Sequence, residues 1–120
     1  MALPRRAVVA VVGDGAALYQ VQALWSAARY GVGVLFIVLS NGRYAIMDRL
    51  AEQHGEDAPW PHFEEIRVST IAGGLGCPSM RIEDHGELLR VLDDVVPGLA
   101  ARTEPLVLDI AVVADPTFDP

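Results

Sequence analysis

The sequence lacks several features that define particular classes of protein. Its 120 residues include a single cysteine, Cys77, which excludes a disulfide framework and favours a reducing compartment. No run of about 18 apolar residues is present, so we expect no transmembrane helix. Only nine lysine and arginine residues stand against 16 aspartates and glutamates, and the net charge of −7 disfavours nucleic acid as a partner. We therefore expect a cytoplasmic protein that binds neither membrane nor nucleic acid.

Apolar residues, in contrast, are abundant. They make up 52% of the chain, enough for a hydrophobic core, and the length fits one domain over residues 1–120. The N-terminal apolar run that starts at Ala7 is short and valine-rich. It ends in Gly-Asp-Gly rather than at a small-residue cleavage site, so we interpret it as a strand and not as a signal peptide.

Apolar runs alternate with helical patterns along the chain. Runs that are apolar on both faces are typical of strands buried between helices in a parallel sheet. They predict strands at residues 7–12, 34–39, 79–83 and 106–113. Helical spacing predicts helices within 16–31, 63–76 and 85–100, the first closed by Gly31 and the last capped by Asp84 with Glu87 three residues on. This order predicts an α/β fold, doubly wound, with a mostly parallel sheet of at least four strands.

Residues 13–15, Gly-Asp-Gly, follow the first predicted strand and raise a question of charge. Glycines at this position let a backbone approach a phosphate, and the helix that follows offers N–H groups to an anion. Asp14, however, should repel a phosphate. A dinucleotide site is disfavoured, because Leu18 replaces the third glycine of G-x-G-x-x-G and the second strand ends in Ser40-Asn41 rather than in an acidic residue.

A divalent cation between the carboxylate and a phosphate removes the conflict. Magnesium prefers oxygen ligands, usually one or two carboxylates with phosphate oxygens and water. Asn41 follows the second predicted strand, and neighbouring strands lie about 5 Å apart, so Asp14 and Asn41 could reach one cation. Gly42 permits a sharp turn, so a backbone carbonyl such as that of Arg43 could be a third ligand. Each motif alone is also compatible with an ordinary turn.

The spacing of these motifs carries a resemblance to a known family. "GDG", 25 residues and then "NG" resembles the motif that binds thiamine diphosphate through magnesium. The stretches "ALWSAARY", "SNGRYA" and "IAGGLGCPSMRIED" resemble the same domain of thiamine-diphosphate-dependent 2-oxo-acid decarboxylases, most closely the benzoylformate decarboxylases. The resemblance covers essentially the whole chain and implies that it is the diphosphate-binding domain of such an enzyme, a carboxy-lyase.

The resemblance also implies roles for particular residues. Magnesium would be held by the side chains of Asp14 and Asn41 and by the backbone carbonyl of Arg43. The diphosphate of the cofactor would be surrounded by these three residues together with Gly13, Gly15, Ala16, Gly42 and Tyr44. A substrate pocket would be lined by Ile46, Met47 and Leu50, whose apolar side chains suit an aryl or branched aliphatic 2-oxo acid. No residue of this chain is assigned a catalytic role.

The chain also departs from the family pattern. Ser40 replaces the first residue of an Asn-Asn pair, and Ala16 replaces a common serine, which removes one hydroxyl contact to the diphosphate. The resemblance does not extend to the start of the diphosphate-binding domain, to the middle domain or to the pyrimidine-binding domain of the family's enzymes. It therefore implies that a partner chain or subunit supplies the pyrimidine-binding domain, in a homo- or hetero-oligomer. A part of an acetolactate synthase-like carboligase and a non-catalytic truncated binding or scaffold module remain alternatives.

Overall fold

The computed structural model describes residues 6–119, so the ends of the predicted domain, residues 1–5 and 120, lie outside it. Its centre is a sheet of four strands in the order β1-β2-β4-β3, and every neighbouring pair is parallel. The strands are β1 (Val8–Gly13), β2 (Val34–Ser40), β3 (Ser79–Ile82) and β4 (Leu106–Ala111). All four predicted strands are confirmed to within two residues at each end.

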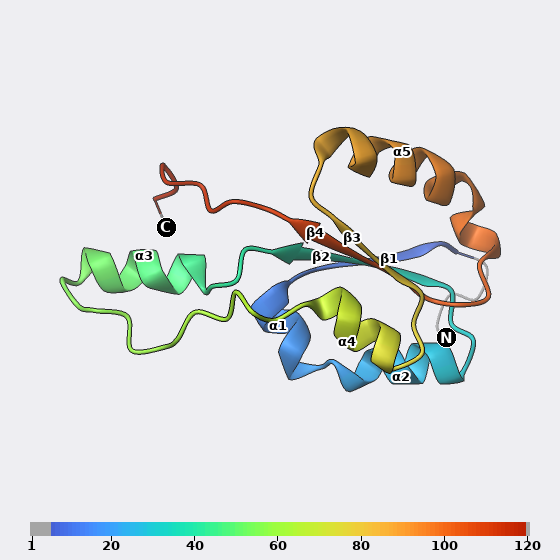
Figure 1. The fold of residues 1–120 in the computed structure, drawn as a ribbon, viewed down its shortest axis with the longest axis horizontal. Helices are drawn as coiled ribbons and strands as arrows, with labels where there is room; N and C mark the ends of the chain where they lie inside the picture. Colours follow the sequence, from blue (N-terminus) through green and yellow to red (C-terminus); the bar gives the residue numbers. More distant parts are fainter. Residues whose placement is uncertain (1–5, 120) are drawn as a thin grey trace.

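Helices cover both faces of this sheet (Figure 1). One face carries α1 (Asp14–Tyr19), α2 (Gln22–Arg29) and α4 (Val68–Gly74), and the other carries α5 (His85–Val95) and the 3-10 helix η1 (Val96–Ala101). The α/β doubly wound fold is thus confirmed. None of the helices within residues 6–119 has the length and apolar character needed to cross a membrane.

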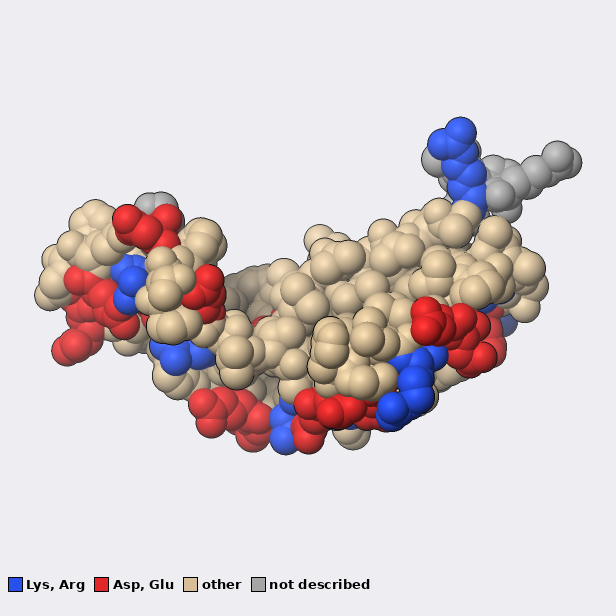
Figure 2. Space-filling model, turned by 90° about the horizontal axis from the view of Figure 1, so that it is seen from above, with Lys and Arg blue, Asp and Glu red and all other residues tan. Residues whose placement is uncertain are grey.

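A fifth α-helix, α3 (Ala45–Gln53), lies apart from these layers, beyond the carboxyl end of β2. It forms a lobe together with the C-terminal segment, to which it is tied by a hydrogen bond of 2.7 Å from Gln53 Nε2 to Asp119 Oδ1. Seen from above, a hollow separates this lobe from the body of the molecule (Figure 2). The lobe thus stands at the end of the sheet where parallel α/β proteins bind their ligands.

Two clusters of buried side chains form the core, one on each face of the sheet. Along β4 the side chains alternate between them, since Val107 belongs to one cluster and Leu106, Leu108 and Ile110 belong to the other. The cluster under α1, α2 and α4 consists of Leu24, Val38, Val68, Ala72, Cys77 and Val107. The cluster under α5 consists of Leu35, Ile82, Leu99, Leu106, Leu108 and Ile110. Cys77 is therefore a core residue, and burial raises the pKa of its thiol.

The prediction of one continuous helix over residues 16–31 is wrong. The structure has two helices there, because Gln20 adopts a backbone conformation (φ −132°, ψ 27°) that ends α1 before α2 begins. Leu24 of α2 belongs to the first core cluster, and Ala17 of α1 and Val21 pack against it, so both helices cover the same face of the sheet. The predicted glycine terminus is confirmed: Gly31 follows α2 with a φ of +63°.

The other two helices are shorter than predicted. The helix predicted over 63–76 is present only as α4, from Val68 to Gly74. The N–H of Phe63 donates to Gly42 O, 2.8 Å away, so the chain before α4 runs beside the loop after β2 and is not helical. The pattern over 85–100 yields α5 followed by η1, since Pro97 lacks the N–H that an α-helix needs. The predicted cap is confirmed, with Asp84 Oδ2 accepting from Glu87 N at 2.8 Å.

Strand β1 forms one edge of the sheet, and one of its faces is open. Val9 and Val11 are 47% and 60% exposed, although both lie in a strand. Backbone hydrogen bonds join the other edge of β1 to β2, in a register that runs from Val8↔Val34 to Gly13↔Leu39. This register brings the ends of β1 and β2 side by side and thereby positions the two loops that follow them.

A buried carboxylate, Asp109, joins the carboxyl halves of three strands. It lies on β4, opposite Val38 of β2 and Arg81 of β3, and is 0% exposed. Its Oδ1 accepts from Ser40 Oγ at 2.6 Å and pairs with Arg81 Nη1 at 2.7 Å, and its Oδ2 accepts from Ser69 N at 2.9 Å. Burial raises the pKa of Asp109, but these hydrogen bonds and the guanidinium outweigh it, so the net pKa lies below the usual value.

We predict that Asp109→Asn lowers the free energy of unfolding at neutral pH by about 3 kcal/mol, because it removes one partner of a buried ion pair. Because the pKa of Asp109 is lower in the folded state than in the unfolded state, its carboxylate stabilises the fold at pH values above the unfolded pKa of about 3.9. This stabilisation is lost as the pH falls through the folded-state pKa. Urea denaturation should therefore show that the difference from the unmodified chain narrows in acid. An equal difference at neutral and strongly acidic pH would contradict the assignment.

Candidate functional site

The site begins where β1 ends and α1 starts, at Asp14. The side chain is buried, with 7% exposure, and both of its oxygens accept backbone hydrogen bonds. Asp14 Oδ1 accepts from Gly15 N at 2.9 Å, and Oδ2 accepts from Gly42 N at 2.7 Å. The second bond joins the loop after β1 to the loop after β2, so the two sequence motifs, separated by 25 residues, meet in one place.

The loop after β2 is a tight turn over Asn41 to Tyr44. Asn41 Oδ1 accepts from Arg43 N at 3.2 Å, which is the side-chain turn expected of an asparagine. Gly42 has a φ of +70°, and a Cβ there would lie 2.8 Å from Glu64 Cγ. Glycine is therefore required at position 42 for both backbone and packing reasons.

These residues surround one cavity of about 350 Å³, which we call the Asp14 cavity. It is lined by every predicted cofactor residue except Gly42: Gly13, Asp14, Gly15, Ala16, Asn41, Arg43 and Tyr44. Gly42 contributes instead through its N–H to Asp14. Of the three predicted substrate-pocket residues, Ile46 and Met47 line the Asp14 cavity, and Leu50 lies in a neighbouring cavity with Met47 and Trp60.

The donors at this cavity fit a hard divalent cation. Among the residues that the structure describes, no arginine or histidine forms an ion pair with Asp14. Each of its oxygens accepts one backbone hydrogen bond and keeps a lone pair for a further partner. Residues 6–119 contain no group of three or more His, Cys, Asp or Glu side chains that could hold a metal. A metal here would depend on one carboxylate, an amide or carbonyl oxygen, and oxygens of a ligand, which is the set that magnesium prefers.

Gly13 and Gly15 differ in what they permit. A Cβ at Gly13 would meet no atom within 4 Å, so the space beside this backbone is open to a ligand. A Cβ at Gly15 would lie 2.5 Å from Tyr44 Cε1, because the Tyr44 ring packs over this position. The ring is held edge-on against Phe63, with ring centroids 4.9 Å apart. Desolvation, then the hydroxyl of Tyr19 and the carboxylate of Asp14, raise the pKa of Tyr44.

A second cavity of about 350 Å³ lies on the other side of Asp14 and Asn41 and includes Arg67 and Arg81. Both arginines have partners. Arg81 pairs with Asp109 and Glu83, and Arg67 Nη1 lies 3.4 Å from Glu64 O. Neither arginine forms an ion pair with Asp14.

Sequence reasoning missed a further polar residue beside the site, Asp48 of α3. It is 5% exposed, and it accepts from Arg43 Nε at 2.7 Å and from Trp60 Nε1 at 2.8 Å. Burial raises the pKa of Asp48, but the hydrogen bonds from Trp60 and Arg43 lower it by more than burial raises it. The net pKa of Asp48 therefore lies below the usual value. No sequence signal marked Asp48, because its partners come from a loop and from a tryptophan 12 residues away.

Comparison with known proteins places this fold and cavity in a class. The model of the family "Thiamine pyrophosphate enzyme, C-terminal TPP binding domain" matches residues 1–110, and the chain belongs to that family. Thiamine pyrophosphate is another name for thiamine diphosphate, so the recognition made from the "GDG" and "NG" motifs is confirmed.

Three individual proteins that resemble this chain are decarboxylases. A benzoylformate decarboxylase of Pseudomonas aeruginosa is 32% identical to this chain, and the match covers 92% of the chain. An alpha-keto-acid decarboxylase of Mycobacterium ulcerans is also 32% identical, over 94% of the chain. A solved 4-hydroxybenzoylformate decarboxylase of Rhodococcus jostii RHA1, described as thiamine diphosphate-dependent, superposes with a TM-score of 0.78 at 27% identity over 97% of this chain. The chain spans only about a fifth of these proteins, at 20%, 19% and 21% of their lengths.

We predict that Gly15→Ala destabilises the chain relative to Gly13→Ala. A methyl group at position 15 must displace the Tyr44 ring, and such overpacking costs about 1–3 kcal/mol. The better helix propensity of alanine offsets about 1 kcal/mol of that cost. Thermal denaturation of the two variants provides the comparison, and a Gly15→Ala chain at least as stable as its Gly13→Ala counterpart would show that Tyr44 is not held in place.

Proposed function

We propose that this chain supplies the metal–diphosphate anchor of a thiamine-diphosphate-dependent 2-oxo-acid decarboxylase of the benzoylformate type. The observation that carries the proposal is the buried, unpaired carboxylate of Asp14 in a cavity shared with Asn41 and Arg43. A buried carboxylate that forms no ion pair is costly, and a bound divalent cation would offset that cost. The relatives' names supply the class of reaction.

In this proposal each residue of the cavity has a physical role. Asp14 and Asn41 hold Mg²⁺ through their side-chain oxygens and Arg43 through its backbone carbonyl. Gly13, Gly15, Ala16, Gly42 and Tyr44 surround the diphosphate. The open space beside Gly13 admits a phosphate close to the backbone. The cofactor, when bound, supplies the electron sink for loss of CO₂ from a 2-oxo acid. This chain binds and orients the cofactor and contributes part of a pocket wall.

The remaining parts of the site come from elsewhere in this proposal. Residues 1–120 act as a diphosphate-binding domain, and a pyrimidine-binding domain in another chain or subunit completes the site in a homo- or hetero-oligomer. The chain spans 20% of the Pseudomonas aeruginosa protein, so the activity of a whole decarboxylase is proposed only for an assembly that contains this domain.

Removal of the Asp14 carboxylate should abolish metal-dependent cofactor binding. Changes to residues around metal ligands cost about 10–100-fold in metal affinity, so loss of a direct ligand in Asp14→Ala should exceed that. Titration of the chain assembled with its pyrimidine-binding partner, with thiamine diphosphate and varied Mg²⁺, measures the effect. Asp94→Asn, an exposed carboxylate of α5, is the matched control. Retention of Mg²⁺-dependent binding by Asp14→Ala would rule out the metal assignment.

The proposed pocket wall makes a separate prediction about substrate. Ile46 and Met47 line the Asp14 cavity and are 51% and 43% exposed, so their apolar side chains are available to a substrate. Met47→Ala in the assembled enzyme should raise KM for benzoylformate several-fold and leave KM for pyruvate nearly unchanged, because only the aryl group loses contact area. Product analysis belongs in the same assay, since formation of acetolactate in place of an aldehyde would favour a carboligase. Equal effects on both substrates would exclude Met47 from the aryl pocket.

A further inference from the structure

The turn from Gly42 to Tyr44 is held from outside the Asp14 cavity by residues that follow it in sequence. Phe63 makes two of these contacts, through its N–H to Gly42 O at 2.8 Å and through its ring to Tyr44 at 4.9 Å between centroids. The third is the ion pair of Arg43 Nε with Asp48 Oδ2 at 2.7 Å. Every residue of the turn therefore has a partner in α3 or in the loop after it.

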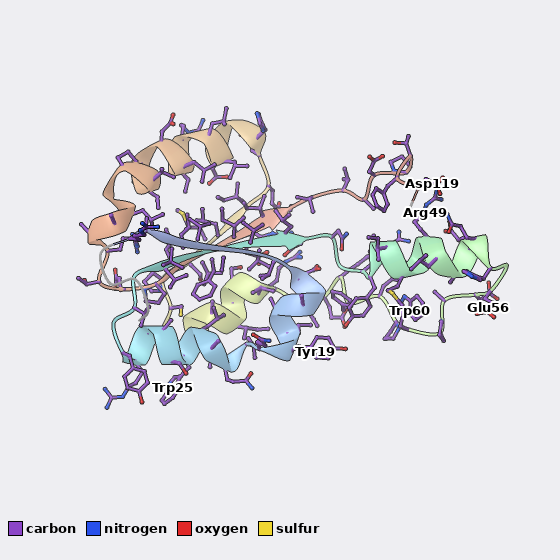
Figure 3. The ribbon with its side chains drawn as sticks, turned by 180° about the vertical axis from the view of Figure 1, so that it is seen from behind. Tyr19, Trp25, Arg49, Glu56, Trp60 and Asp119 are labelled. Atoms are coloured by element: carbon purple, nitrogen blue, oxygen red, sulfur yellow. The ribbon has the colours of Figure 1, made fainter. Side chains whose placement is uncertain are left out.

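Asp48 connects this turn to the loop after α3. One carboxylate oxygen binds Arg43, and the other accepts from Trp60 Nε1 at 2.8 Å. His62 Nε2 lies 3.8 Å from the same carboxylate. Trp60 lies beside α3, at the end of the molecule opposite Trp25 (Figure 3). A buried carboxylate is costly unless it is fully hydrogen-bonded, and Asp48 is bonded at both oxygens in a lobe remote from the main core.

The arrangement matters because the turn has little freedom to change without disturbing Asp14. The amide of Gly42 donates to Asp14, and the amide of Arg43 donates to Asn41. A rotation at Arg43 would alter both the environment of the carboxylate and the side chain of Asn41. Arg43 also lines the Asp14 cavity, and its positive charge, which would oppose a cation there, is paired with Asp48.

We propose that Asp48 and Trp60 are positioning residues for the metal–diphosphate site. Trp60 holds the Asp48 carboxylate, and Asp48 holds and neutralises Arg43, so that the turn from Gly42 to Tyr44 keeps the shape that a metal requires. Neither residue lines the Asp14 cavity. This inference rests on the proposed function, since it assigns a second layer of support to the same site.

The test uses the chain assembled with its pyrimidine-binding partner and Mn²⁺ as the metal probe. In the presence of thiamine diphosphate, the EPR signal of free Mn²⁺ gives the dissociation constant. Trp60→Phe removes the hydrogen bond to Asp48 and keeps an aromatic ring, so Mn²⁺ should bind about tenfold more weakly, as for other residues that support metal ligands. Trp25→Phe is the matched control, because Trp25 is half-exposed on α2, and its Mn²⁺ constant should not change.

A second measurement needs no cofactor. In the absence of metal and thiamine diphosphate, the amides of Gly42, Arg43 and Phe63 should exchange hydrogen faster in Trp60→Phe than in the unmodified chain, and Trp25→Phe should leave them unchanged. Asp48→Asn should shift both the Mn²⁺ constant and the exchange rates in the same direction as Trp60→Phe. It provides the same test if Trp60→Phe does not fold.

The possible outcomes separate the two proposals. Weaker Mn²⁺ binding together with faster exchange in both variants supports the positioning role. A lower melting temperature with an unchanged Mn²⁺ constant overturns it, because Trp60 would then serve stability alone. If the unmodified assembly binds no Mn²⁺ with thiamine diphosphate, the proposed function fails, and this inference fails with it.

Discussion

The hydrogen bond from Gly42 N to Asp14 Oδ2, 2.7 Å long, is the contact on which the arrangement of the site depends. It joins the ends of two adjacent parallel strands, and it does so through a buried carboxylate that no cationic side chain of the described residues neutralises. Backbone amides carry only partial positive charge, so they orient the carboxylate without cancelling its charge. The loop geometry and the negative potential of the cavity therefore have one origin. A cation would complete an arrangement that the two loops have already formed.

The sheet beneath these loops relies on a different use of a carboxylate. Asp109 is also buried, yet it pairs with Arg81 and accepts from Ser40 and Ser69. The hydroxyl of Ser40 is therefore engaged by Asp109 inside the sheet. The three buried aspartates thus have two kinds of environment: Asp109 and Asp48 each pair with a guanidinium, whereas Asp14 accepts hydrogen bonds from backbone amides.

Much of the fold was predictable from the sequence, because continuous apolar runs define parallel strands and Gly31 marks a helix end by its conformational freedom. The convergence of Asp14 and Asn41 on one cavity was predictable for a related reason, since parallel strands place their carboxyl ends at one edge. The departure of Phe63 from the predicted helix and the Asp48–Trp60 bond were not, because each depends on a contact between residues distant in sequence that no local pattern records. The break at Gln20 was missed as well, because the helical spacing of apolar residues continues through it. Leu50 and Met47, three residues apart on α3, line a common cavity, as their spacing on one helix face predicts.

The position of β1 at the edge of the described sheet has a consequence for self-association. A strand with an unpaired edge and exposed valines, here Val9 at 47% and Val11 at 60%, is a template to which another strand can add. Pairing of two such edges rises with concentration, so any segment that covers β1 protects the fold against aggregation as well as adding to its sheet.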